Sequence, residues 1–163
     1  MSFDIRLERL LDTTPDVAFH HWVDADARRR WYQGDEHDWV VDAHTDLGVG
    51  GRFWVTWGPT PDLVYREEGV FLVVEPPHRL MYSSRFTPMT RAEGDAFEVQ
   101  VTVTFDDENG RTRLRLLEQG YPTAEVRDAF LRQGSQQGLD YYERTLPGHQ
   151  APPNSPHSRQ AAT

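Results

Sequence analysis

Residues 97–119, FEVQVTVTFDDENGRTRLRLLEQ, contain the pattern that decides the fold class. From Phe97 to Phe105, large apolar side chains alternate with polar ones, which is typical of an antiparallel strand buried on one face only. The triplet Glu108-Asn109-Gly110 then marks a tight turn, and a second strand follows at about 111–119. The stretch therefore predicts a β-hairpin whose apolar face covers a core.

The sequence before this hairpin repeats the same signals. A first strand is predicted at 3–11, and further strands at about 37–45, 51–58, 63–75 and 79–87, before the hairpin strand at about 96–106. The turns between them are marked by Gly48 to Gly51, Gly58-Pro59, Pro76-Pro77 and Glu93-Gly94-Asp95. We therefore expect about seven antiparallel strands.

Helical signals occur at both ends of this strand-rich region. Thr14-Pro15-Asp16 begins one short helix, and a second passes through residues 28–32 and ends at Gly34. The last element is a long helix over about 123–145, with apolar side chains at helical spacing. This order predicts an α+β fold, in which a strongly curved antiparallel sheet wraps around the C-terminal helix and two short helices close one end. The space between sheet and helix is either a filled core or a ligand cavity.

Composition excludes several classes of function. The chain has 163 residues and no cysteine, and all 17 basic residues are arginine, so thiolate, disulfide and lysine chemistry are absent. The net charge of −9 argues against nucleic acid and anionic membranes as partners. The apolar runs fall far short of a membrane span, and we find no signal peptide, so a cytoplasmic location is expected.

The chain is expected to form one domain and a tail. Residues 1–146 hold all the strand and helix signals and every aromatic ring. Residues 147–163, PGHQAPPNSPHSRQAAT, lack any large apolar side chain, which predicts a disordered tail rich in Pro, Ser and Gln.

Five blocks of sequence carry a family pattern that covers roughly residues 3–146 in order. They are TTPDVAFHHWVDADARRRWYQG, DLGVGGRFWVTWGP, YREEGVFLVVEPPHRLMYSSRF, VTVTFDDENGRTRLRLLEQGYP and AEVRDAF. The most specific pieces are Gly50-Gly51, the turn from Glu75 to Leu80 and the strand start from Gly110 to Leu114. On these residues the chain resembles the heat-shock-protein-90 ATPase-activator-like (AHSA-like) family of the START/SRPBCC helix-grip superfamily.

The resemblance implies a helix-grip fold and a range of functions. Single-domain bacterial members look like binders of small hydrophobic molecules, some superfamily relatives act as polyketide cyclases, and others sequester or detoxify antibiotics. Family members commonly carry a Gly-Trp pair in the C-terminal helix, whereas this chain has Gly134-Ser135. Either neighbouring rings such as Trp54, Trp57 or Tyr141 fill the volume of that indole, or the pocket is enlarged or reshaped, and we favour the second alternative.

Glu118 is the candidate with the clearest chemical interest. It follows Leu114 and Leu116 at a spacing of two, so all three share one face of the strand. If that face lines a cavity, Glu118 needs a polar partner, which Arg85, Arg113, Gln133 or Gln137 would supply. It would then orient a ligand or act as a general base with a raised pKa. The alternative is an exposed carboxylate at the end of a strand.

The aromatic side chains are more numerous than a small core requires. Most of them are expected to be core, and a subset would form the wall of a cavity for a planar ligand. We assign to this wall Trp39, Trp54, Trp57, Phe71, Tyr82 and Tyr141, with Arg85, Arg113, Glu118 and Gln137 as polar contacts.

Other chemistry finds little support. The histidines lack the spacing of a zinc site, no Gly-x-Ser-x-Gly elbow occurs, and Gly48 to Gly51 lead into a strand, so neither a metal nor a cofactor is predicted. The leading hypothesis is binding of a small aromatic, polyketide-like or lipid-like molecule. The alternatives are a cyclase, aromatase or hydrolase that uses Glu118, and a protein-interaction or chaperone-cofactor module. Homodimerisation through an edge strand is compatible with the sequence.

Overall fold

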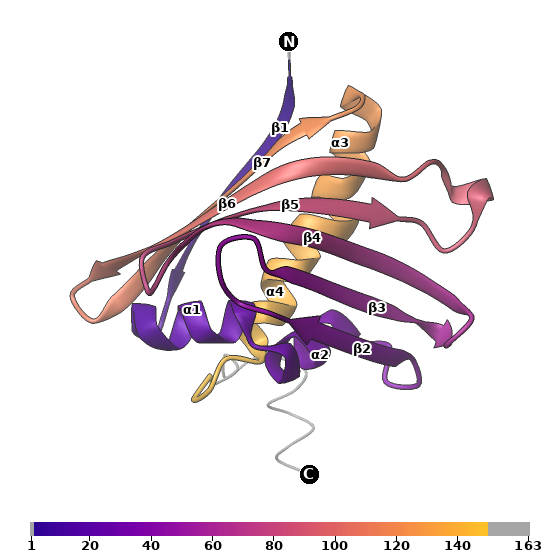
Figure 1. Ribbon diagram of the computed structural model, residues 1–163. Helices are drawn as coiled ribbons and strands as arrows, with labels where there is room; N and C mark the ends of the chain where they lie inside the picture. Colours follow the sequence, from indigo (N-terminus) through magenta and orange to yellow (C-terminus); the bar gives the residue numbers. More distant parts are fainter. Residues whose placement is uncertain (1, 150–163) are drawn as a thin grey trace.

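Seven strands form one curved antiparallel sheet in the computed structural model, which describes residues 2–149 (Figure 1). The strands are β1 (Phe3–Leu11), β2 (Val40–Thr45), β3 (Arg52–Thr60), β4 (Leu63–Glu75), β5 (Arg79–Thr87), β6 (Phe97–Glu108) and β7 (Arg111–Tyr121). Their order is β1-β7-β6-β5-β4-β3-β2. The chain therefore crosses from one edge of the sheet to the other after β1 and returns strand by strand, until β7 pairs with β1.

Helical segments cover the concave face of this sheet (Figure 1). They are α1 (Pro15–Val23), α2 (Ala25–Gln33), α3 (Ala124–Phe130), the π-helical turn η2 (Leu131–Ser135) and α4 (Gln136–Arg144), with a 3-10 turn η1 (Arg91–Glu93) between β5 and β6. The α+β helix-grip prediction is confirmed. The C-terminal helix is not continuous, however, because η2 interrupts its hydrogen-bond pattern between α3 and α4.

The second strand begins later than the sequence predicts. Instead of starting near residue 37, β2 starts at Val40, because residues 34–39 form a turn. The Gln33 side chain holds this turn by donating from Nε2 to the carbonyl oxygens of His37 and Trp39. The Trp39 amide in turn donates to the Glu36 carbonyl at 3.0 Å. These bonds satisfy backbone groups that a strand would otherwise pair.

The β6–β7 hairpin has the geometry that its sequence predicts. Val101, Val103 and Phe105 are buried on the concave face, and the polar residues between them face outward. The two turn residues, Asn109 and Gly110, have φ of 57° and 88°. Positive φ at both positions is the type I′ turn that matches the twist of a two-residue hairpin.

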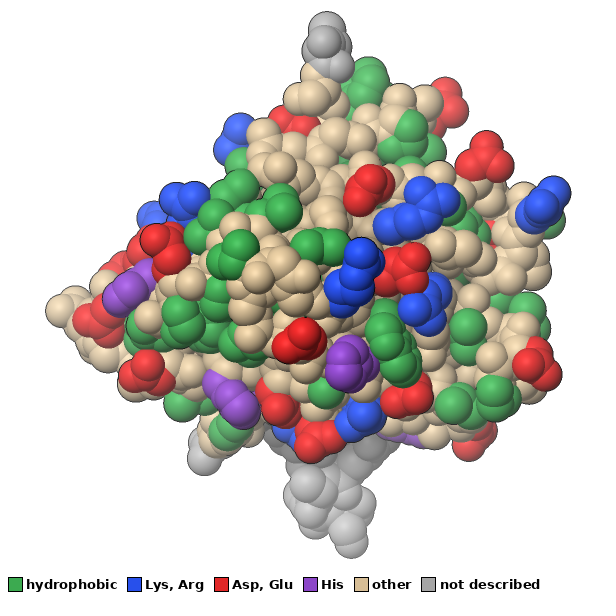
Figure 2. Space-filling model, in the orientation of Figure 1, with side chains coloured by type: hydrophobic (Ala, Val, Ile, Leu, Met, Phe, Trp, Pro, Cys, Tyr) green, Lys and Arg blue, Asp and Glu red, His purple; other side chains and the backbone are tan. Residues whose placement is uncertain are grey.

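The convex face of the sheet carries charges of both signs, which Figure 2 shows interspersed. Ion pairs such as Arg115–Asp106, at 2.7 Å, join neighbouring strands on this face. Because these pairs are exposed, each adds little to stability. The convex face is therefore a solvated surface, and the apolar interior lies on the other side.

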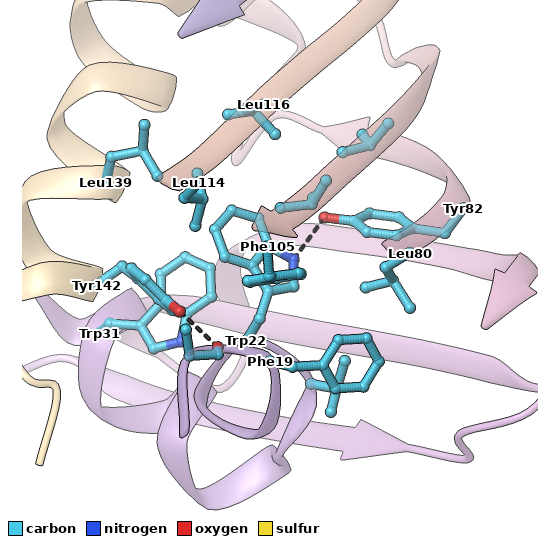
Figure 3. Close-up of a cluster of buried hydrophobic side chains, with 14 of the residues drawn as sticks. Phe19, Trp22, Trp31, Leu80, Tyr82, Phe105, Leu114, Leu116, Leu139 and Tyr142 are labelled. Atoms are coloured by element: carbon cyan, nitrogen blue, oxygen red, sulfur yellow. Dashed lines mark hydrogen bonds between the residues drawn. The ribbon is translucent and has the colours of Figure 1, made fainter. Parts of the chain in front are cut away.

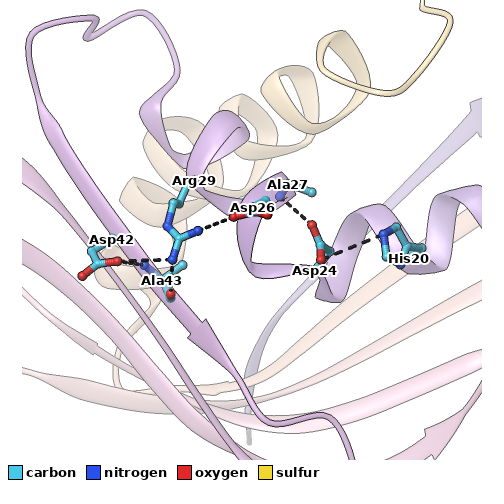
Figure 4. A network of polar contacts seen from close by, with 7 residues as sticks. All are labelled: His20, Asp24, Asp26, Ala27, Arg29, Asp42 and Ala43. Carbon is cyan, nitrogen blue, oxygen red and sulfur yellow. Dashed lines mark hydrogen bonds and ion pairs between the residues drawn. The ribbon is translucent and has the colours of Figure 1, made fainter.

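The two short helices are fixed to each other and to the sheet edge by polar contacts (Figure 4). The Asp24 carboxylate caps α2 by accepting from the Ala27 amide at 3.0 Å. Arg29 donates to the Ala43 carbonyl in β2 at 2.9 Å and also pairs with Asp26. This network closes the end of the interior that lies against α1 and α2.

Aromatic rings fill that end of the interior (Figure 3). Trp22 packs edge-to-face against Tyr142 at 5.0 Å and against Phe105 at 6.3 Å between ring centroids. Its indole Nε1 donates to the Tyr82 hydroxyl at 3.1 Å, and the Tyr142 hydroxyl donates to the Ala18 carbonyl. The polar atoms of these buried rings are thus satisfied, which makes this end a well-packed core.

Candidate functional site

A cavity of about 180 Å³ lies between the concave face of the sheet and the C-terminal helical segment. We call it the inner cavity. Its walls are mainly aromatic; the rings are those of Trp22, Trp31, Tyr32, Trp57, Tyr82, Phe86, Phe97, Phe130 and Tyr141. The polar side chains among the lining residues are Glu67, Ser84, Glu118, Gln133, Ser135 and Gln137. An apolar cavity with a few converging polar groups is the usual form of a small-molecule site.

A second hollow of about 530 Å³, which we call the outer hollow, adjoins the inner cavity. It lies between α3 and the strand ends of β3, β4 and β5, and also contacts the loop that carries Glu93 and Asp95. Four rings line both spaces and form what we call the aromatic collar; they are Trp57, Phe86, Phe97 and Phe130. Within the collar, Phe130 lies 5.0 Å from Phe86 and 5.4 Å from Phe97 between ring centroids.

Glu118 lies on the inner face of β7 with Leu114 and Leu116, as strand alternation predicts, and it lines the inner cavity. Its Oε1 accepts hydrogen bonds from the Ser135 hydroxyl at 2.5 Å and the Tyr121 hydroxyl at 3.1 Å. None of the described residues donates a hydrogen bond to Oε2. This oxygen is therefore free to bond a molecule in the cavity. Burial raises the pKa of Glu118 to about 7, although these two hydroxyl bonds oppose the rise.

A bulge in β7 brings Tyr121 to the same side as Glu118. Strict alternation from Glu118 would turn Tyr121 outward, but the register with β1 shifts between these residues. Gly120 stands at the bulge with φ of 98°, in the region that favours glycine, and its amide donates to Asp4 at 3.2 Å. Gly120 therefore allows the backbone conformation that brings the Tyr121 hydroxyl to Glu118.

Glu67 is a second carboxylate in the inner cavity. Both of its oxygens accept hydrogen bonds, one from the Tyr32 hydroxyl and the other from the Ser84 hydroxyl at 2.6 Å. These donors come from α2 and β5, on opposite sides of β4 in the sequence. The repulsion of Glu67 is a further cause of the raised pKa of Glu118, so the two carboxylates act on each other across the cavity.

The π-helical turn η2 forms the wall opposite the sheet. It presents Gly134 and Ser135 to the inner cavity, and Ser135 is the buried residue that donates to Glu118. The Gly134-Ser135 pair thus lies directly against the empty space. π-Helical turns often occur at functional sites, because the extra residue redirects the side chains around it.

Five of the sequence-predicted residues line the inner cavity: Trp57, Tyr82, Glu118, Gln137 and Tyr141. Tyr141 contributes its ring, while its hydroxyl points away and donates to Asp35 at 3.1 Å. Gln137 lies on the helix at the exposed rim.

The two predicted arginine partners of Glu118 lie elsewhere, and this expectation is corrected. Arg113 alternates with the buried Thr112 and Leu114, so it faces outward and pairs with Glu108 at 2.9 Å. Arg85 is exposed on the convex face of β5. The partners of Glu118 are instead the hydroxyls of Ser135 and Tyr121.

Three predicted aromatic wall residues also lie outside the cavity. Trp54 is on the convex face of β3, where it stacks with His44. Phe71 is fully buried in the core. Trp39 packs at 6.3 Å from Tyr65, beyond the outer hollow. The strand pattern separates these positions, since Trp57 faces inward while Trp54, three residues earlier, faces outward.

Arg28, the first of three consecutive arginines in α2, lies in the interior and not on a solvated helix face. It is fully buried, and its Nε donates to the Trp22 carbonyl at 2.7 Å. The guanidinium lies 4.6 Å above the ring of Phe53 and 5.9 Å from that of Tyr82, while its two terminal nitrogens lack a hydrogen-bond partner among the described residues. It lies behind the cavity wall and is stabilised by the ring faces.

Glu67 and the collar phenylalanines are among the cavity residues that the site predicted from the sequence does not include. In β4, Tyr65, Glu67 and Phe71 alternate on one face, and the buried Phe71 shows that this face points inward. The same alternation that identified Glu118 therefore contains the signal for Glu67. Phe86 and Phe97 are cross-strand partners on β5 and β6, which requires the register to be known.

Two features are absent from residues 2–149, a helix that could span a membrane and a cluster of metal-ligating side chains. No helix in this part of the chain is long and apolar enough to span a bilayer. Nor do three or more His, Asp or Glu side chains converge there in a group that would hold a metal ion.

Several solved structures resemble the chain. Protein CV1439 from Chromobacterium violaceum has a TM-score of 0.72 at 20% identity, with 90% of this chain and 99% of that chain covered. A protein from Rhizobium leguminosarum has a TM-score of 0.70 at 24% identity over 90% and 95% of the two chains. An AHSA1-like protein from Aeromonas hydrophila has a TM-score of 0.67 at 24% identity over 91% and 99%. At these identities the likeness establishes the fold alone.

The family follows from the sequence model. None of the curated proteins matches the chain. The family model described as Activator of Hsp90 ATPase homolog 1-like protein matches residues 12–146, which include α1, α2, β2 to β7 and the whole C-terminal helical segment. The chain therefore belongs to the family of Activator of Hsp90 ATPase homolog 1-like proteins.

Proposed function

We propose that this protein binds a small, largely apolar molecule in the inner cavity, between the sheet and the C-terminal helical segment. The observation that carries the proposal is an aromatic-walled cavity into which two carboxylates, Glu67 and Glu118, project. A merely structural interior would be filled, as the end around Trp22 and Phe105 is. Unfilled space beside buried polar groups is instead the form expected of a binding site.

The dimensions of the two spaces suggest the size of the molecule. An engineered protein cavity of about 150 Å³ holds one benzene molecule. The inner cavity, at about 180 Å³, therefore has room for one aromatic ring or a group of similar volume. The outer hollow extends this space past the aromatic collar, so a planar molecule of two or three rings would reach from one into the other.

Thermal stabilisation against a panel of flavonoids, polyketides, lipids and steroids tests the proposal, with NMR shift changes to locate the site. A bound compound should raise the melting temperature and shift resonances of cavity residues. The variant Ser135→Trp should place an indole in the cavity and abolish binding. The matched variant Gln136→Trp, at the exposed next position, should bind normally. Failure of every compound to bind the wild type, or equal binding by both variants, would contradict the proposal.

The environment of Glu118 supports a second candidate, turnover of the bound molecule. A carboxyl group whose pKa is raised to about 7 exchanges a proton readily near neutral pH, as a general acid or base must. Its free Oε2 is the atom that would transfer the proton. A cyclase, aromatase or hydrolase reaction would use such a group. Glu118→Gln should then abolish turnover of a bound compound while its affinity survives, and turnover that persists in this variant would exclude the role.

A further inference from the structure

The charged side chains that line the two hollows all have the same sign. Glu67 and Glu118 line the inner cavity, and Glu93 and Asp95 line the outer hollow. Among residues 2–149, no arginine or histidine lines either space, and the chain has no lysine. A ligand that enters through the outer hollow therefore meets carboxylates and ring faces along its whole path.

This combination of carboxylates and ring faces is the chemistry that recognises organic cations. The face of an aromatic ring carries negative electrostatic potential and attracts an ammonium group. Trp57 and Tyr65 line the outer hollow with Glu93 and Asp95, and Trp57 also lines the inner cavity with Tyr32 and Glu67. An anionic ligand would instead be repelled by every charged group that it met.

The hydrogen-bonding groups of the inner cavity also suit a ligand that donates hydrogen bonds. Glu118 has Oε2 free of donors from the described residues. The Tyr32 and Ser84 hydroxyls that donate to Glu67 are rotatable, so they tolerate a competing donor at this carboxylate. An ammonium group has only donors to offer, and the two carboxylates offer acceptors.

We propose that the ligand of this cavity is an organic cation, a protonated amine attached to an aromatic or similarly flat apolar body. The amine pairs with Glu118 and Glu67, and the apolar body packs against the aromatic collar. This inference rests on the proposed function, because it names the chemical class of the molecule that the same cavity binds.

Arg144 lies 4.8 Å from the centroid of the Tyr141 ring and pairs with Asp35 at 2.9 Å, but it does not line the cavity. Arg28 is a buried arginine beside the site, and it too leaves the charged side chains of the cavity walls exclusively acidic. It lies behind Tyr82 and Phe53, does not line the cavity, and is fully buried. Its charge partly offsets that of Glu67, because both act on Tyr32 and Tyr82, with opposite effects on the pKa of each tyrosine. The carboxylate left without a cation is then Glu118, which makes it the principal partner of the amine.

Proton release should accompany binding. The titratable and polar groups that face Glu118 are Glu67 from β4, Tyr82 from β5, Tyr121 from β7 and Ser135 from η2. None of them is a cation. A bound ammonium would supply the missing positive charge and favour the carboxylate, so Glu118 should lose its proton when the amine binds below about pH 7.

A matched trio of probes tests the proposal: naphthalen-2-ylmethylamine, naphthalen-2-ylmethanol and 2-naphthoate, which share a ring system and differ in charge. Titration calorimetry at about pH 8 should show the amine binding at least about tenfold more tightly than the alcohol, and no binding of 2-naphthoate. At about pH 6, the amine's binding heat should depend on the ionisation enthalpy of the buffer, as proton release requires.

Substitutions locate the effect. Glu118→Gln and Glu67→Gln should each reduce the preference for the amine over the alcohol, and Glu118→Gln should abolish proton release. Glu98→Gln removes the same charge from an exposed position on β6 and should change neither. Retained binding of the alcohol by all three variants shows that they fold.

The possible failures can be told apart. Equal or tighter binding of the alcohol or of 2-naphthoate would overturn the cationic assignment and leave the proposed function standing. Binding of neutral panel compounds without binding of the amine would do the same. If neither the trio nor the panel binds, both proposals fall.

Discussion

The interior has two ends that lie under the same sheet and against the same C-terminal helical segment, yet one is filled and the other is hollow. The filled end contains Trp22, Phe105 and Tyr142 in edge-to-face contact, capped by α1 and α2 (Figure 3). The hollow end contains the inner cavity, the aromatic collar and the two carboxylates. Sheet curvature alone therefore does not decide whether the space is filled.

The helical segment shows what makes the difference. In α4, Tyr142 is buried and packs against Trp22 in the filled end, while the buried Leu139 also lines the inner cavity. None of the seven residues of α3 is fully buried, and the turn between the two helices presents Gly134 and Ser135 to the sheet. The small side chain of Ser135 and the lack of one at Gly138 leave space that a large side chain would fill. The hollow is thus a consequence of residue size on one helix face.

Removal of a large ring should distinguish the two ends most strongly. Phe105 is fully buried, so Phe105→Ala should lower the free energy of unfolding by about 4 kcal/mol, since it removes packing and leaves a void. Phe130 is half-buried beside space that is already empty, so Phe130→Ala should lower it by only about 1–2 kcal/mol. Urea unfolding measures both. If Phe105→Ala does not fold, Phe105→Leu against Phe130→Leu makes the same comparison, and equal losses would show that the ends are packed alike.

The buried carboxyl of the hollow end should make stability fall as pH rises. Burial raises the pKa of Glu118 from 4.5 to about 7, so between these values the folded state holds a proton that the unfolded chain has lost. The contribution of Glu118 to the free energy of unfolding is fully present below pH 4.5 and is lost as the pH rises through 7. The total loss is about 3 kcal/mol.

Unfolding free energies at about pH 5 and pH 8 check this dependence. Glu118→Gln cannot titrate, so it should lack that part of the loss, whereas the exposed Glu98→Gln should retain it. Parallel pH profiles for wild type and Glu118→Gln would show that Glu118 ionises freely in the folded protein.

The buried histidine of the filled end should act in the opposite direction. His21 packs against Tyr142 with Nε2 at 2.9 Å from the Thr145 hydroxyl, and burial is the main cause that lowers its pKa from 6.5 to about 4. The contribution of His21 to the free energy of unfolding is therefore fully present above pH 6.5 and is lost as the pH falls through about 4. We expect about 2 kcal/mol, because the nearby charges of Arg30 and His20 are partly screened.

His21→Gln should flatten the acid limb of the stability profile, measured by unfolding between about pH 6.5 and pH 4.5. The exposed His78 is not among the groups that act on His21, so His78→Gln serves as the control and should leave that limb unchanged. An unaltered acid limb in His21→Gln would mean that His21 takes up its proton without loss of packing.

The sequence predicts the fold more completely than the site. Alternation within single strands predicts most of the strands and places Glu118 on one strand face with Leu114 and Leu116, because such patterns are local. The cavity depends on contacts between distant elements, and Arg113 and Trp54 were assigned to it although their strand parity turns them outward. The contact from Tyr121 to Glu118 depends on a bulge that alternation does not predict. The strand face on which a side chain lies can thus be predicted from sequence, whereas the position of a cavity cannot.

The smallest expected effect comes from adding one methyl group to the hollow end. Gly138 lies in α4 against the inner cavity, and a Cβ at this position would meet no atom within 4 Å. Gly138→Ala should raise the unfolding free energy by about 1 kcal/mol, since alanine favours the helix over glycine by this amount. Gly134→Ala provides the comparison, because its Cβ would approach the Phe130 ring to 2.9 Å and displace the collar. If thermal unfolding shows that Gly138→Ala gains no stability, or that Gly134→Ala gains as much, the space beside α4 is not open, and the hollow end is filled in solution.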